Sequence, residues 1–209
     1  MDEILSADLV TCSRCAATVG PYSDTREGCL ECRGERFRFD AAVRLGLYEG
    51  KLRRACLDFK LSRNEILGPA LARLFLRERG DALRAVGADM VVAVPLHFIR
   101  RLRRGFNQAE SLARTLATEL NLPHRSRILK RIRKTMPQSE LKRDARFGNV
   151  RDAFSARRTT DLRGATVLLV DDILTTGATC SEAARALKAT GARRIVVAVL
   201  ARSQEHMGA

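Results

Sequence analysis

A chain of 209 residues is long enough for one domain with a small appendage, and a content of 45% hydrophobic and 30% charged residues excludes a disordered protein. No apolar run approaches the roughly 18 residues of a membrane span, and the first residues lack the basic and apolar segments of a signal peptide, so we expect a cytoplasmic protein. The 38 lysines and arginines outnumber the 24 aspartates and glutamates, and the resulting net charge of +14 favours a polyanionic partner.

Four cysteines near the N-terminus form two Cys-x2-Cys pairs. Cys12 and Cys15 make the first pair, Cys29 and Cys32 make the second, and thirteen residues separate the pairs. Two such pairs can close tetrahedrally around one zinc ion, which would stabilise a stretch too short and polar to fold unaided. Two disulfides are the alternative, but they are rare in the cytoplasm, and a dithiol redox pair explains only one of the two pairs. We therefore predict a structural zinc-ribbon module over residues 1–40, with these four cysteines as the metal ligands.

The predicted zinc-ribbon module is acidic. Residues 1–40 carry five basic and eight acidic side chains, a net charge of −3, so residues 41–209 carry +17. Four thiolates around one Zn²⁺ add a further −2, which makes about −5 by formal charge. A module of this charge is unsuited to gripping a nucleic-acid backbone, and we expect a structural or protein-docking role.

The rest of the chain alternates apolar strands with amphipathic helices. The expected strands are 41–48, 90–94, 167–171 and 195–201. The expected helices are 52–61, a second from 66 or 69 to 79 that Gly80 ends, a third that Asn107 caps, and a fourth over 178–190. This order predicts an α/β domain over residues 41–209, with a mainly parallel sheet flanked by helices and a ligand at the carboxyl ends of the strands. Cys56 and Cys180 fall on apolar helix faces and are expected to be small core residues.

Residues 167–179 carry the most specific pattern in the chain. An apolar strand ends in Asp171 and Asp172, and the loop that follows leads directly into a helix. The backbone N–H groups of such a junction and the helix dipole favour a phosphate group, and Gly177 lets the backbone approach it closely. The two carboxylates then lie beside the phosphate, where they suit the two hydroxyls of a ribose or a magnesium ion. An ordinary strand–turn–helix is the alternative, but it does not require two carboxylates at this point.

A strongly basic segment follows the expected strand 90–94. Residues 97–146 contain fourteen basic and four acidic side chains, a net charge of +10. The candidates for phosphate binding in its first part are His97, Arg100, Arg103 and Arg104. A lone histidine, however, is more often an ordinary hydrogen-bonded side chain than a functional one. Charge alone does not choose between a pyrophosphate and a nucleic-acid backbone, and a merely solvated basic surface is the third interpretation.

Residues 130–146 are polar and basic and have no clear apolar period. This is the character of a mobile loop that closes over substrates, excludes water and brings in cationic side chains. The candidate side chains are Arg131, Arg133 and Lys134. An exposed loop without a catalytic role is the alternative.

The pattern in residues 167–179 resembles the motif by which type I phosphoribosyltransferases bind phosphoribosyl pyrophosphate (PRPP). The order of features along the chain is similar to that of the ComF family, which comprises phosphoribosyltransferase-like competence proteins. This wider resemblance runs from Cys12 to Ala201. It rests on the paired cysteines, on Tyr48-Glu49-Gly50 with Phe59-Lys60, and on the segments 95–108, 133–154 and 171–179.

The resemblance implies a type I phosphoribosyltransferase-like fold with an N-terminal zinc ribbon, and a site for PRPP with magnesium. Asp171 and Asp172 would contact the ribose 2′- and 3′-hydroxyls and orient the ribose for catalysis, and one of them would accept a proton. The residues implied in holding the 5′-phosphate are Thr175, Thr176, Gly177, Ala178 and Thr179. The loop after the strand 90–94, which carries His97 and four arginines, would receive the pyrophosphate, and the loop over 130–146 would close over it.

The ComF family is linked to natural transformation and the uptake of single-stranded DNA, and its acceptor is not established. Single-stranded DNA, and competence-machinery proteins docking on the zinc ribbon, are therefore further expected partners. Three functions stay open: a PRPP-dependent transferase or hydrolase, a non-catalytic PRPP sensor, and a protein that handles single-stranded DNA. The last predicts aromatic stacking platforms among the basic residues. The chain has no tryptophan, and only Phe98, Phe106 and Phe147 lie in or at the edge of the basic segment, so stacking is poorly supplied.

Overall fold

The protein, described here by a computed structural model over residues 10–61, 66–99, 102, 105–136, 141–157 and 162–204, is built around a four-stranded sheet. Every neighbouring pair of strands is parallel, in the order β1-β6-β5-β2. The strands are β1 (Ala41–Leu47), β2 (Met90–Ala93), β5 (Thr166–Leu174) and β6 (Arg194–Arg202). The parallel sheet with flanking helices that the sequence predicts is therefore confirmed.

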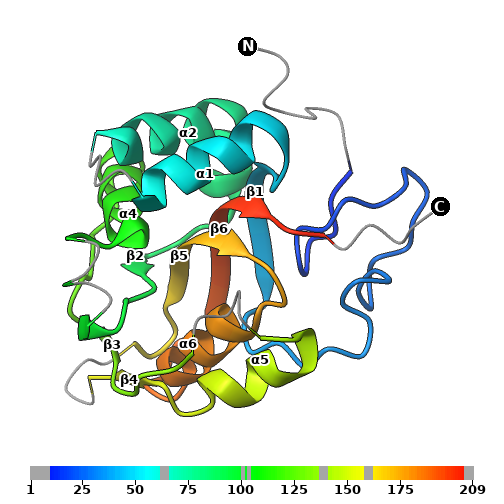
Figure 1. Ribbon diagram of the computed structural model, residues 1–209. Helices are drawn as coiled ribbons and strands as arrows, with labels where there is room; N and C mark the ends of the chain where they lie inside the picture. Colours follow the sequence, from blue (N-terminus) through cyan, green and yellow to red (C-terminus); the bar gives the residue numbers. More distant parts are fainter. Residues whose placement is uncertain are drawn as a thin grey trace.

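Helices cover both faces of the sheet (Figure 1). The helices on one face are α1 (Gly50–Leu61), α2 (Leu67–Ala85) and α4 (Gln108–Glu119). The helix on the other face is α6 (Ala178–Lys188), with α5 (Arg143–Val150) against it. An antiparallel hairpin of β3 (Leu129–Arg131) and β4 (Phe154–Ala156) also contacts α6. Within the described ranges, no helix is long and apolar enough to cross a membrane.

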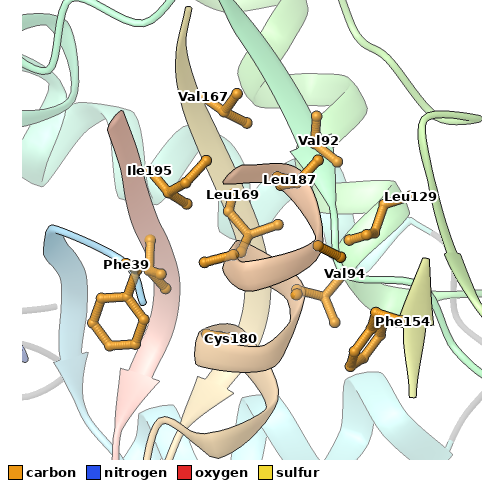
Figure 2. Packing of buried hydrophobic residues seen from close by; sticks show 14 of the residues in the cluster. Phe39, Val92, Val94, Leu129, Phe154, Val167, Leu169, Cys180, Leu187 and Ile195 are labelled. Atoms are coloured by element: carbon orange, nitrogen blue, oxygen red, sulfur yellow. The ribbon is translucent and has the colours of Figure 1, made fainter. Parts of the chain in front are cut away.

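The central strands are buried on both sides, and their side chains alternate between two cores. In β5, Val167 and Leu169 pack in the core that α6 covers, whereas Leu168 and Val170 pack with α1, α2 and α4. Figure 2 shows the first of these cores, to which Leu169 of β5 and Leu187 of α6 both belong. Full burial of each such side chain contributes roughly 1.5–3 kcal/mol, which explains why these strands read as continuous apolar runs.

α2 runs further than the sequence predicts. It does not end at Gly80 but bends at Arg79, whose φ of −133° is non-helical, and continues to Ala85. Leu83 and Val86 are buried in the core beneath this second part. Their packing outweighs the weak helix propensity of Gly80, which costs about 1 kcal/mol.

β5 also extends past the acidic pair. Asp171 is in register with Val199 and Ile173 with Ala201, so both carboxylates belong to the strand itself. β6 supplies the hydrogen-bonding partners for this extension because it continues to Arg202. The expected strand end at 171 was therefore too early.

Asn107 lies at the N-cap position of α4, but its side chain makes no capping hydrogen bond, so the expected cap is wrong in this respect. Its Nδ2 instead donates to the carbonyl oxygen of Val94 at 3.1 Å. This bond ties the start of α4 to the segment that leaves β2.

Candidate functional site

The acidic pair lies near the carboxyl end of β5, beside the segment that leaves β2. The backbone N–H of Val94 donates to the carbonyl oxygen of Val170, one residue before the pair. Each carboxylate is oriented by the backbone: Asp171 Oδ1 accepts a bond from the N–H of Asp172 at 2.9 Å, and Asp172 Oδ1 accepts one from the N–H of Ile173 at 2.7 Å. The Oδ2 atoms of Asp171 and Asp172 remain available to other groups.

One of these oxygens forms an ion pair with a lysine that is distant in the sequence. Lys60 Nζ, near the end of α1, lies 3.1 Å from Asp172 Oδ2, and both side chains are largely buried, with 25% and 18% exposed. The other is close to a thiol: Cys180 Sγ lies 3.6 Å from Asp171 Oδ2. Cys180 is the buried core residue that the sequence predicts, and it also donates a weak hydrogen bond to the site.

Burial and mutual repulsion set the protonation of this cluster. Burial, followed by the charge of Asp172, raises the pKa of Asp171 to about 7. Burial lowers the pKa of Lys60, but the charge and hydrogen bond of Asp172, together with the charges of Tyr48 and Asp171, raise the pKa overall. Burial and the charge of Asp171 keep the pKa of Cys180 well above its ordinary value, so the thiol stays protonated. The site therefore contains a carboxyl group that titrates near neutrality beside a fixed ion pair.

Residues 175–177, which we call the phosphate loop, join the strand to α6. Gly177 has the left-handed φ of 81° and accepts, through its carbonyl oxygen, a bond from the N–H of Ser181 at 2.8 Å. Thr176 is buried, and its Oγ1 accepts a bond from the N–H of Ala178 at 3.5 Å. The first turn of α6 presents N–H groups without helical partners at this point. The loop residues that the sequence predicts for a 5′-phosphate thus lie together at a helix N-terminus, immediately after two carboxylates.

A cavity of about 600 Å³ lies beyond β2, and we call it the basic cavity. It is lined by Pro95, Leu96, Phe98, Asn107, Glu110, Ser126, Arg127, Leu129, Lys130, Arg131 and Arg157. Four cationic side chains face one carboxylate, that of Glu110. Three of the four, Arg127, Lys130 and Arg157, make no hydrogen bond or ion pair with any described residue. A cavity lined in this way suits an anion with several oxygens.

The basic cavity brings together two segments that the sequence treats separately. Phe98 comes from the loop predicted to receive pyrophosphate. Arg131 comes from the segment 130–146 predicted to be a mobile loop, but that prediction is wrong at both ends, because Arg131 lies in β3 and residues 143–146 begin α5. Arg131 also lies over the ring of Phe154, with 5.2 Å between its guanidinium carbon and the ring centroid. Arg127 precedes β3 and Arg157 follows β4. The sequence does not predict that they line a site, because strands of three residues leave no periodic signal.

The other predicted cations divide into three groups. Arg100, Arg103 and Arg104 lie outside the described residues. His97 is not among the residues that line the basic cavity, and its Nδ1 accepts a bond from the N–H of Ile99 at 3.4 Å. Arg133 donates to the carbonyl oxygens of Asn149 and Arg151, and Lys134 is exposed.

The four N-terminal cysteines converge as the sequence predicts. Their Sγ atoms all lie within 4.8 Å of one another, with 3.9 Å between Cys12 and Cys32 and 3.5 Å between Cys15 and Cys29. Zn–S bonds of about 2.3 Å in a tetrahedron require about 3.8 Å between sulfurs, so the four residues can hold a zinc ion. Gly28 permits the second knuckle, because its φ is 98° and a Cβ there would lie 2.9 Å from Cys32 Sγ.

Burial of these thiols favours a bound cation. It raises the pKa of Cys32 to about 11 and also raises the pKa of Cys15, whereas hydrogen bonds from the surrounding backbone outweigh burial at Cys12 and lower its pKa. Thiolates in such surroundings need a positive charge among them, which a dication would supply.

The chain is similar to several known proteins. The family described as phosphoribosyl transferase domain matches residues 73–207. Competence protein F of Haemophilus influenzae is 32% identical over 196 residues, which cover 92% of this chain and 84% of that protein. DNA utilization protein YhgH of Escherichia coli K12 is 32% identical over 199 residues, which cover 94% of this chain and 86% of that protein. Among solved structures, glutamine PRPP amidotransferase from B. subtilis matches with a TM-score of 0.40 and 25% identity, over 66% of this chain and 26% of that one.

Proposed function

The chain belongs to the ComF family and carries a phosphoribosyl transferase domain, and on this basis we propose that it binds PRPP with magnesium at the carboxyl end of β5. The observation that carries the proposal is the direct succession of Asp171, Asp172 and the phosphate loop at the start of α6. The 5′-phosphate would lie on the N–H groups of the loop and the first helical turn. The ribose hydroxyls would face the carboxylates, which also suit a magnesium ion.

Lys60 has a defined part in this proposal. Its ammonium group compensates the charge of Asp172, at 3.1 Å, while the ribose is absent. A bound ribose or magnesium ion would share that carboxylate with Lys60, and the positive charge would then face the ligand's phosphates. Lys60 is accordingly a ligand-positioning residue in the proposal.

The basic cavity supplies a place for the pyrophosphate end of the ligand. Pyrophosphate carries several negative charges, and Arg127, Lys130 and Arg157 are cations without partners among the described residues. In a transfer reaction, the bond from ribose C1 to the pyrophosphate oxygen breaks and a bond from C1 to a nucleophile forms. The pyrophosphate keeps the electron pair of the broken bond, and Asp171, with its pKa of about 7, can accept the proton that the nucleophile loses. Magnesium, when bound, would shield the phosphate charges.

A calorimetric comparison of two ligands tests this division of the site. PRPP with magnesium and ribose 5-phosphate share the 5′-phosphate and the ribose hydroxyls, and only PRPP has the pyrophosphate. The double variant Arg127→Gln, Arg157→Gln should weaken PRPP binding about tenfold or more, as expected for the loss of charge-assisted bonds, and leave ribose 5-phosphate binding unchanged. The exposed Arg73→Gln is the matched control. Equal losses for both ligands would place these arginines elsewhere.

Handling of single-stranded DNA in natural transformation is the second candidate. Its specific support is Phe98, a ring with 69% of its surface exposed, on the same basic cavity. Phe98→Ala should then weaken binding of a labelled oligonucleotide, and the affinity should fall steeply with salt concentration. An affinity for the oligonucleotide that changes neither with Phe98→Ala nor with salt concentration would exclude this candidate.

A further inference from the structure

The N-terminal cysteine segment, residues 10–40, lies along the edge of the sheet beside β1 and reaches the end of β6 (Figure 1). We call it the cysteine module. The N–H of Ala42, in β1, donates to the carbonyl oxygen of Ser13 at 2.9 Å. Arg44, also in β1, donates to the carbonyl oxygen of Ala16 at 2.7 Å. The module is thus attached to the sheet at several points rather than tethered by a linker.

One buried guanidinium joins the cysteine module to the phosphate loop. Arg202, the last residue of β6, is only 2% exposed. Its Nε donates to the carbonyl oxygen of Cys15 at 3.1 Å, and its Nη1 donates to the carbonyl oxygen of Leu174 at 3.2 Å and to that of Thr175. A buried charge of this kind is tolerated only while such bonds are made. The same side chain therefore fixes a metal-ligand residue and the first residue of the phosphate loop.

An aromatic contact reinforces this junction. A Cβ placed on Gly177 would lie 2.8 Å from Cε1 of Phe37, so the ring of Phe37 rests directly on the phosphate loop. Next to it, the N–H of Arg38 donates to Ser181 Oγ in the first turn of α6 at 3.0 Å. Behind the ring lies Arg14, 5.6 Å from its centroid, which also donates to the carbonyl oxygen of Cys32 at 3.2 Å. Phe37 is thus held between the cysteine knuckles and the loop.

The hydrophobic core that belongs to the cysteine module alone is small, although Ala16 and Phe39 also pack in the core that α6 covers. Its own buried cluster consists of the four cysteines and Ala17. So small a core cannot offset the chain entropy of about thirty residues, and a bound metal would supply most of the stability. We therefore expect the positions of the Cys15 carbonyl and the Phe37 ring to respond to the metal.

We propose that the cysteine module is part of the phosphate site, and that Arg202 and Phe37 couple metal binding at the four cysteines to the conformation of the phosphate loop. Loss of the metal frees the Cys15 carbonyl and Phe37, and the loop and the first turn of α6 become mobile. By linkage, a phosphate ligand on the loop slows release of the metal by the same coupling free energy. The identity of the phosphate ligand in this proposal rests on the proposed function, PRPP binding.

Hydrogen exchange at residues 175–181 tests the coupling without any ligand. The zinc-loaded full-length protein and the same protein stripped by a chelator are compared. We expect exchange in these residues to become about tenfold faster in the stripped protein, within the usual range of coupling between sites. Unchanged exchange at 175–181 would overturn the proposal, whatever PRPP does.

Two variants locate the coupling. Arg202→Met removes every bond of the guanidinium, and Phe37→Leu is the milder change in case the first does not fold. Each should still take up zinc but show fast exchange at 175–181 even when loaded. Arg194→Met, at the exposed start of β6, is the matched control and should behave as the wild type. Variants with wild-type exchange when loaded would exclude Arg202 and Phe37 as the connection.

The reciprocal measurement uses ribose 5-phosphate, which needs no magnesium. Zinc release to a chromogenic chelator should slow about fivefold or more when ribose 5-phosphate is bound, and should lose this dependence in Phe37→Leu. If calorimetry shows that ribose 5-phosphate binds but the rate of zinc release does not change, the proposal is overturned. If the ligand does not bind at all, the proposed function fails, while the exchange experiment still decides the coupling.

Discussion

Asp171→Asn should change how the stability of the protein depends on pH. The pKa of Asp171 is raised from 3.8 to about 7, first by burial and then by the charge of Asp172. The folded state therefore holds a proton that the unfolded chain releases between about pH 4 and pH 7, and the free energy of unfolding falls as the pH rises through this window. Asparagine has nearly the same shape, still accepts the bond from the N–H of Asp172, and carries no titrating proton.

The size of the effect follows from the two pKa values. Complete ionisation of Asp171 costs about 4 kcal/mol relative to the unfolded chain, and between pH 5 and pH 8 the wild type should lose roughly 2–3 kcal/mol of stability that the variant keeps. Other titrating groups are common to both proteins, so the difference between the two curves isolates this residue.

Urea denaturation at pH 5, 6, 7 and 8 measures both curves. We expect the free energy of unfolding of the variant, relative to that of the wild type, to rise by about 1.4 kcal/mol per pH unit near pH 6 and to level off above pH 8. Curves that stay parallel within about 0.5 kcal/mol would refute the argument, because that is the usual error of additivity.

Three further predictions concern other parts of the site. Lys60→Met leaves the Asp172 carboxylate without its partner and should cost about 2–3 kcal/mol in urea denaturation, with most of the loss regained in a Lys60→Arg protein. Gly177→Ala combines an unfavourable positive φ with a contact of 2.8 Å to the ring of Phe37, so it should lower the free energy of unfolding by about 2 kcal/mol. In a Phe37→Ala protein, which lacks the ring, the same substitution should cost only about 1 kcal/mol. An equal cost in both backgrounds would exclude the contact. Cys12→Ser should reduce zinc, measured by elemental analysis, from about one per chain to a weakly held fraction, whereas full retention would refute the four-cysteine site.

The parts of the site that the sequence predicts are those built from contiguous residues. The strand, the acidic pair and the start of α6 follow one another within 166–178, so each local signal supports the next. The two Cys-x2-Cys pairs are likewise local, because each pair forms one turn of chain around a metal. The family resemblance rests on these same local patterns, and the comparisons confirm it.

The parts that the sequence does not predict are contacts between distant residues. Phe59-Lys60 contributes to the family resemblance, but no local pattern indicates that the end of α1 meets Asp172, since the contact depends on how α1 packs on the sheet. The same holds for Arg202, which looks like the ordinary polar end of a strand and instead joins the cysteine module to the phosphate loop. α2 continues past Gly80 for a similar reason, because tertiary packing overrides local propensity.

The most direct test of the account is calorimetric titration of PRPP with magnesium into the purified, zinc-loaded protein and into the double variant Asp171→Asn, Asp172→Asn. The account predicts saturable binding to the wild type, and loss of that binding in a variant whose circular dichroism spectrum is unchanged. Equal affinity in the variant, or no binding to the folded wild type, would contradict the assignment of the site.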